Sequence, residues 1–147
     1  MIRCAVVTES IDPAVLLAEV TTRATGATTL FVGTVRNVNE GRAVTGIAYS
    51  SYSAMALEEM ERIAREAAQQ FDGVRVAMEH RVGLLVLEEI SVAIAVAHAR
   101  RAPAMDASRF IIEELKRRVP VWKQEHYVDG ERVWVDPTAT PVPVSAA

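Results

Sequence analysis

The chain has 147 residues, a formal net charge of −3 and a single cysteine, and half of its residues are hydrophobic. This length and balance are typical of one globular domain that buries a core, and the acidic charge argues against a non-specific nucleic-acid binder, which usually carries a basic surface. Because Cys4 is alone, an intramolecular disulfide and a cysteine metal cluster are both excluded.

No segment of the sequence resembles a membrane anchor or a signal peptide. The longest apolar run, residues 90–97, is much shorter than a helix that crosses a bilayer. The N-terminus begins with a strand-like run rather than a basic segment followed by a long apolar one. We therefore expect a cytoplasmic protein that does not bind membranes.

The first elements in chain order are a strand and a helix. Residues 2–8 are rich in Ile and Val and predict a strand. Asp12 followed by Pro13 predicts a helix start, since Asp caps helices and Pro is favoured at the first helical position. We expect three side chains of this helix to face the core: Val15, Leu16 and Val20.

A strand, a loop, a second strand and a helix follow. Residues 28–35 predict a strand, residues 36–42 are polar and predict a loop, and residues 43–52 predict the next strand. Ser53 is the expected cap of the helix. Apolar side chains recur there at helical spacing and predict its buried face: Ala56, Met60, Ile63, Ala64, Ala67 and Phe71.

The next two strands differ in pattern. Residues 74–81 alternate between apolar and polar side chains, which predicts a half-buried strand, and Gly83 predicts a bend. Residues 90–98 are almost continuously apolar, which predicts a central strand that is covered on both faces.

The last elements are a helix and a hairpin. We expect a helix over residues 104–118, ended by Pro120, with a core stripe of Ser108, Ile111, Ile112, Leu115 and Val119. Residues 121–127 continue extended, and a turn at 129–130 leads into residues 131–135 as a hairpin. Trp122 and Trp134 are expected to pack on each other or on a partner.

Helices and strands are mixed without strict alternation, so the predicted class is α+β. We expect one domain over residues 1–136. Residues 137–147 contain three prolines and small side chains, and they predict a disordered tail.

Both lysines of the chain, Lys116 and Lys123, lie in the stretch ELKRRVPVWKQE, whereas the other fourteen basic residues are arginines. A desolvated lysine can lose its proton and attack a carbonyl, which arginine cannot do. Two plain alternatives are an arginine-biased genome and, for Lys116, a cation at a helix C-terminus. The two amines can converge only if the strand after Pro120 folds back across the helix end.

Three arginines are candidate anion ligands. Arg100 and Arg101 precede a helix N-terminus, where forked hydrogen bonds can hold a phosphate, and Arg36 begins a loop directly after a strand. The alternative is that all three are solvated surface arginines. The histidines, among them His98, show no spacing typical of a metal site, so we expect neither a metal nor a cofactor.

Several motifs together resemble one family. In order they are FVGTVRNVN, HRVG and LKRRVPVWKQE, within a match over residues 26–135. The chain resembles the large, catalytic subunit of molybdopterin synthase, the MoaE family. The resemblance implies an α/β-hammerhead fold with a mixed or antiparallel sheet, and a homodimer that forms a heterotetramer with a small ubiquitin-like sulfur carrier. It also implies sulfur transfer from the carrier's Gly-Gly thiocarboxylate tail to cyclic pyranopterin monophosphate, which forms the dithiolene.

The resemblance places the family's two active-site lysines on Lys116 and Lys123 and its strand-end arginine on Arg36. Its His-Arg pair falls on Arg100 and Arg101, so arginine replaces the histidine in this chain. Arginine can bind an anion but cannot shuttle a proton near neutral pH. His98, two residues before, is a candidate replacement for proton transfer.

Two other functions remain open from the sequence. One is a non-catalytic subunit that docks a ubiquitin-like tail, which predicts partner binding that survives Lys116→Ala without product. The other is a lysine Schiff-base enzyme that acts on a small carbonyl compound, which predicts that borohydride traps substrate on Lys116 without a partner protein.

Overall fold

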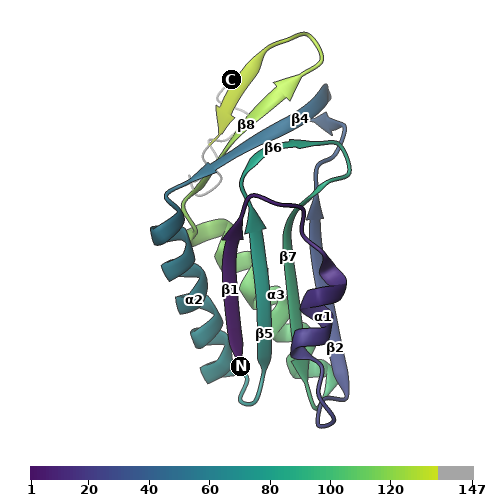
Figure 1. Ribbon diagram of the computed structural model, residues 1–147, viewed down its shortest axis with the longest axis vertical. Coiled ribbons are helices and arrows are strands. Elements are labelled where there is room, and N and C mark those ends of the chain that lie inside the picture. Colours follow the sequence, from purple (N-terminus) through teal and green to yellow (C-terminus); the bar gives the residue numbers. More distant parts are fainter. Residues whose placement is uncertain (136–147) are drawn as a thin grey trace.

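The computed structural model describes residues 1–135, so the predicted tail over residues 137–147 lies outside the described residues. Three helices and two sheets make up this part of the chain (Figure 1). The predicted α+β class with mixed and antiparallel sheets and a C-terminal hairpin is confirmed. Among the described residues, no helix combines the length and the apolar character needed to cross a membrane.

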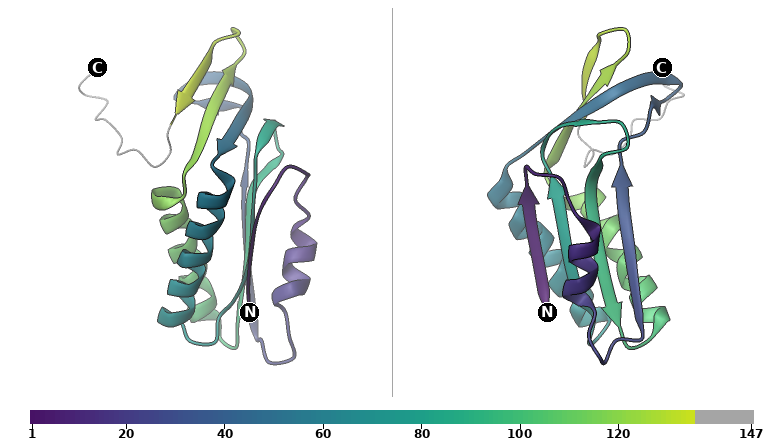
Figure 2. Two further views of the ribbon diagram at one scale, coloured as in Figure 1. Left: turned by 60° about the vertical axis from the view of Figure 1, so that its left-hand side comes forward. Right: turned by 45° about the vertical axis from the view of Figure 1, so that its right-hand side comes forward.

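The first sheet has four strands in the order β1 (Ile2–Val7), β5 (Arg75–Arg81), β7 (Ile90–His98) and β2 (Ala27–Thr34). β1 is parallel to β5, and the other neighbours are antiparallel. The helices α2 (Ser53–Gln70) and α3 (Arg101–Arg118) cover one face, and α1 (Pro13–Val20) covers the other, as Figure 2 shows. The central place predicted for residues 90–98 is therefore confirmed.

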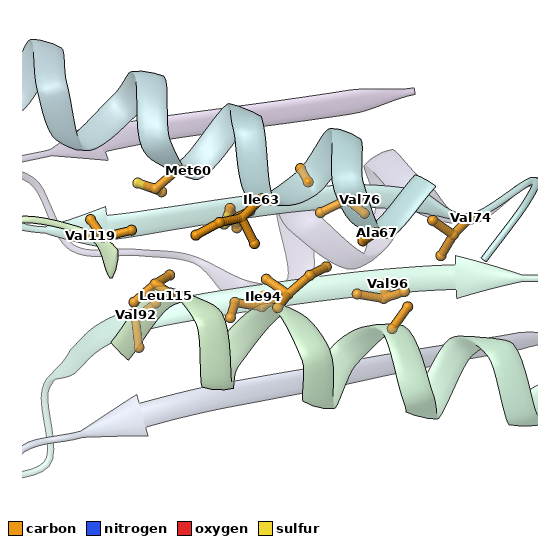
Figure 3. Close-up of a cluster of buried hydrophobic side chains, with 14 of the residues drawn as sticks. Met60, Ile63, Ala67, Val74, Val76, Val92, Ile94, Val96, Leu115 and Val119 are labelled. Carbon is orange, nitrogen blue, oxygen red and sulfur yellow. The ribbon is translucent and has the colours of Figure 1, made fainter. Parts of the chain in front are cut away.

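The two faces of β7 carry side chains of different size. Val92, Ile94 and Val96 belong to the larger core cluster beneath α2 and α3, part of which Figure 3 shows. The alternate residues are alanines, and they pack with α1 through Leu16 and Val20. Alternation along a strand separates the two sets, and the small alanine side chains leave room for α1 to lie close.

β5 is buried more completely than its alternating pattern predicts. Ala77 lies beneath α1, while Met78 and His80 lie on the opposite face and are also buried. The prediction for α1 was also wrong in one position, because Val15 is 51% exposed. Leu16 and Val20 face the sheet and Leu17 packs beside them, so Val15 is left on the solvent side of the helix.

The second sheet packs across one end of the first (Figure 1). Its strands follow the order β3 (Val38–Asn39), β4 (Arg42–Ser51), β8 (Val121–Tyr127) and β9 (Arg132–Val135). β6 (Gly83–Val86) pairs with β4 on the edge opposite β8. The two-residue strand β3 lies within the predicted loop over residues 36–42, and β6 begins at Gly83, where a bend was predicted.

Some boundaries and caps also differ from the prediction. α3 begins at Arg101 instead of 104. Tyr52, not Ser53, precedes the first residue of α2, and no side chain caps it. Trp122 packs edge-to-face on Tyr52 at 5.2 Å between ring centroids, while Trp134 is 59% exposed, so stacking of the two tryptophans is not observed.

Candidate functional site

Two adjoining cavities lie where the second sheet meets the end of the first. The first chamber has a volume of about 180 Å³ and the second about 220 Å³. Both are lined by Tyr49, Lys116 and Lys123, and we call the two together the lysine pocket. The first chamber has many polar side chains, and the second combines Leu115, Val119 and Val121 with the polar side chains of His80 and the residues shared by both chambers.

The two lysines converge because β8 turns back after α3. Lys116 lies in the last turn of α3, and after Pro120 the chain enters β8, where Lys123 pairs with Tyr49 of β4. The fold-back that the sequence requires for convergence is therefore present. It brings together side chains on a helix end and a strand.

The two amines have different surroundings. Burial lowers the pKa of Lys116, and the nearby charge of Lys123 lowers it further. Lys116 makes no hydrogen bond or ion pair with any described residue, although solvent reaches its side chain through the pocket. Lys123 forms an ion pair with Glu125, with 3.2 Å between Nζ and Oε1. Lys123 therefore has a carboxylate partner, whereas Lys116 has none among residues 1–135.

Glu125 is a pocket residue that the sequence reasoning missed. Its side chain is 1% exposed, and its second carboxylate oxygen has no hydrogen-bond partner. A buried carboxylate is costly unless it is paired, so its place beside Lys123 explains why it is tolerated. The signal in the sequence was the spacing Lys-x-Glu on a strand, which puts both side chains on one face.

Tyr49 and His80 were also missed. Their rings meet edge-to-face, with centroids 5.5 Å apart and planes at 70°. Burial raises the pKa of Tyr49 and lowers the pKa of His80 to about 4, so both side chains are neutral at neutral pH. Tyr49 is not distinguished in the sequence from an ordinary strand residue, and His80 begins the HRVG motif without a role assigned to it.

Arg36 is the third predicted residue that reaches the lysine pocket. It follows Val35, which is buried, and its own side chain is exposed and lines the first chamber together with Asn39. An exposed guanidinium at the rim of a cavity with two amines makes this end of the molecule suitable for an anionic ligand.

Arg100 and Arg101 lie at the other end of the first sheet. Lys116 follows Arg101 by about 15 residues in α3, which corresponds to about 22 Å along the helix axis. Both arginines are exposed and border a shallow depression beside Gly26. Within one chain they therefore do not join the lysine pocket.

His98 lies beside these arginines and is occupied by backbone hydrogen bonds. Its Nε2 donates to the carbonyl of Asp72 at 2.8 Å, and its Nδ1 accepts from the N–H of Arg100 at 3.0 Å. Because both ring nitrogens have partners, this histidine fixes the start of α3. It does not reach Lys116 of the same chain.

A family model for the MoaE protein matches residues 6–118. The chain belongs to the MoaE family. It is 40% identical over 125 residues to the molybdopterin synthase catalytic subunit of Neosartorya fischeri, covering 85% of this chain and 66% of that relative. The chain thus spans just under two thirds of the relative's length. The resemblance drawn from the sequence motifs is confirmed.

Solved structures agree with this assignment. The molybdopterin synthase of Staphylococcus aureus matches with a TM-score of 0.86 and 30% identity, covering 89% of this chain and 95% of that one. A complex of subunits 1 and 2 of molybdopterin-converting factor from Helicobacter pylori matches with a TM-score of 0.74 and 23% identity, covering 89% and 88%. The second match supports the fold alone.

Proposed function

We propose that this chain is the catalytic subunit of a molybdopterin synthase. The reaction transfers sulfur from the C-terminal thiocarboxylate of a small ubiquitin-like carrier to cyclic pyranopterin monophosphate, in the cytoplasm. The single observation that carries the proposal is the convergence of Lys116, Lys123 and Arg36 on one cavity in a chain of this family. All three cations suit the two anionic reactants, a thiocarboxylate and a phosphate ester.

The two lysines have separate tasks in this proposal. Lys116, with its lowered pKa and no protein partner, supplies an amine that acts as a base or nucleophile near neutral pH. Lys123, which forms an ion pair with Glu125, stabilises negative charge that develops during sulfur transfer. Arg36 binds the substrate phosphate at the rim.

A small carrier subunit is the proposed partner. A peptide tail without side chains, such as Gly-Gly, is the kind of segment that fits a narrow cavity of about 180 Å³. The Helicobacter pylori structure that shares the fold is a complex of two subunits, which supports a two-subunit assembly for this chain.

We also propose a homodimer, because Arg100 and Arg101 are about 22 Å from Lys116 along α3. If they bind the same substrate as the lysines, a second copy of the chain must supply them. The guanidinium groups of Arg100 and Arg101 from one copy would then join Arg36 and the two lysines of the other copy.

The test is a reconstitution. The purified chain is mixed with thiocarboxylated carrier and cyclic pyranopterin monophosphate, and dithiolene product is measured. Product that depends on all three components supports the proposal. Carrier binding without product would favour the docking subunit, and a borohydride adduct on Lys116 in the absence of carrier would favour the Schiff-base enzyme.

A further inference from the structure

His80 is a buried histidine of the lysine pocket to which the proposed reaction gives no task. It is 2% exposed, lies near the end of β5 and lines the second chamber together with Lys116. It also begins the HRVG motif, which helped to identify the family without having a role there.

The hydrogen bonds of His80 define its tautomer. Nδ1 lies 2.9 Å from the carbonyl oxygen of Arg81, and since a carbonyl only accepts, Nδ1 carries the proton. Nε2 of the neutral ring is then an acceptor. The pKa of His80 is lowered to about 4 by burial, with a further contribution from the charge of Lys116, so the ring stays neutral under ordinary conditions.

Lys116 provides the complementary group. Its ammonium has three donors and no protein acceptor among residues 1–135. A cation that is partly removed from water is stabilised by any acceptor within reach. The other polar side chains of the second chamber are Tyr49 and Lys123, and Lys123 is itself a donor that is paired with Glu125.

Apart from Nε2 of His80, the Tyr49 hydroxyl is the other side-chain acceptor of the second chamber. Its remaining lining is aliphatic and consists of Leu115, Val119 and Val121. The Tyr49 ring packs against the imidazole edge-to-face and so restricts the plane of the ring. His80 is therefore a fixed acceptor in a chamber that it shares with an unpartnered amine.

We propose that His80 is a positioning residue for Lys116: its Nε2 accepts a hydrogen bond from the Lys116 amine, directly or through one water molecule. This contact sets the direction of the amine toward the first chamber, where the reactants of the proposed function meet. The expected effect of His80 on turnover rests on the proposed function, whereas its expected effect on the pKa of Lys116 does not.

The test uses two variants of similar volume, His80→Gln and His80→Leu. Both lose the Nδ1–H bond to Arg81, but the glutamine oxygen restores an acceptor near the place of Nε2. Because the chain has only two lysines, ¹³C-lysine labelling gives two side-chain signals, which Lys116→Arg assigns. The pKa of Lys116 is then read from an NMR titration.

We expect the pKa of Lys116 to be lower in the Leu variant than in the wild type, because the lost acceptor favoured the charged amine. The Gln variant should return it to the wild-type value. In the reconstituted assay kcat should still fall about tenfold for Leu, although more of the amine is neutral, because a misplaced amine slows the chemical step. The Gln variant should recover most of that loss.

Equal Lys116 pKa values in the Leu and Gln variants would overturn the proposal, because a purely structural histidine affects both alike. If neither variant folds, His80→Asn replaces them: it keeps a donor near Nδ1 but does not reach the place of Nε2. A wild-type Lys116 pKa in that variant would also overturn it. If the wild-type chain gives no dithiolene, the proposed function fails, while the titration still decides the role of His80.

Discussion

The two ends of β7 carry similar residues in opposite surroundings. At the Ser91 end, which we call the enclosed end, the second sheet and the last turn of α3 form the lysine pocket. His80 is buried there and Lys123 is half-buried, while solvent still reaches Lys116. At the His98 end, which we call the open end, two exposed arginines border a shallow depression, and His98 is half-buried. Burial changes the pKa of Lys116 and His80 at the enclosed end. The comparison teaches that the enclosed end can tune an amine, whereas the open end can only offer fixed charge until another molecule covers it.

Lys116→Arg should have the largest effect. The substitution keeps a cation at the end of α3 but removes a group that can lose its proton. We expect kcat to fall at least about 100-fold in the reconstituted assay, with carrier binding retained. In the wild type the rate should rise with pH as Lys116 deprotonates, because the neutral amine is the active form.

Thermal unfolding provides the control for this variant, since Lys116 makes no ion pair in the described structure and its loss should not destabilise the fold. A variant with a near-normal rate would show that a positive charge at position 116 is sufficient. The arginines of the open end could also supply such a charge.

The arginines of the open end should come next. Arg100→Ala combined with Arg101→Ala should lower the rate about tenfold or more, mainly through weaker substrate binding. Co-expression of this chain with a Lys116→Arg chain tests where the arginines act. If a second copy supplies them, mixed dimers contain one complete pocket, and random pairing should restore about a quarter of the wild-type activity.

No recovery in the mixed dimers, with each parent inactive, would mean that the arginines serve the chain that carries them. The two ends of β7 would then belong to separate sites.

The pH dependence of the free energy of unfolding should reflect the burial of His80. The pKa of His80 falls from 6.5 to about 4 on folding, so between these values the unfolded chain binds a proton that the native chain does not. The free energy of unfolding should therefore fall by about 2 kcal/mol from pH 7 to pH 5 on this account alone. Urea unfolding of the wild type and of His80→Gln at both pH values measures the difference.

An equal loss in both proteins would show that His80 is accessible to protons in the native state. His80 would then be as accessible to solvent as the side chains of the open end, in contrast to its burial in the structure.

The sequence predicted the parts of this comparison that depend on local pattern. The continuous apolar run identified β7, helical spacing identified the buried face of α2, and Pro120 separated α3 from β8. The separation of Arg100 from Lys116 was not predicted, because the family motif carries residue types and not distances within one chain. Glu125 and His80 were missed because each is an ordinary polar residue of a strand until β8 folds back and buries it.

The smallest effect is expected for His98→Ala. The sequence suggested His98 as a replacement for the missing proton donor, but its two ring nitrogens bind the Asp72 carbonyl and the Arg100 N–H. Loss of these bonds should cost about 1–2 kcal/mol of stability and leave kcat within about twofold of the wild type. A larger fall in kcat with unchanged unfolding would mean that the open end takes part in proton transfer after all, and that a second copy brings it to the lysines. The activity of mixed dimers between the double arginine variant and the Lys116→Arg chain would then depend on the His98 of the Lys116→Arg chain. Co-expression with and without His98→Ala in that chain measures this dependence.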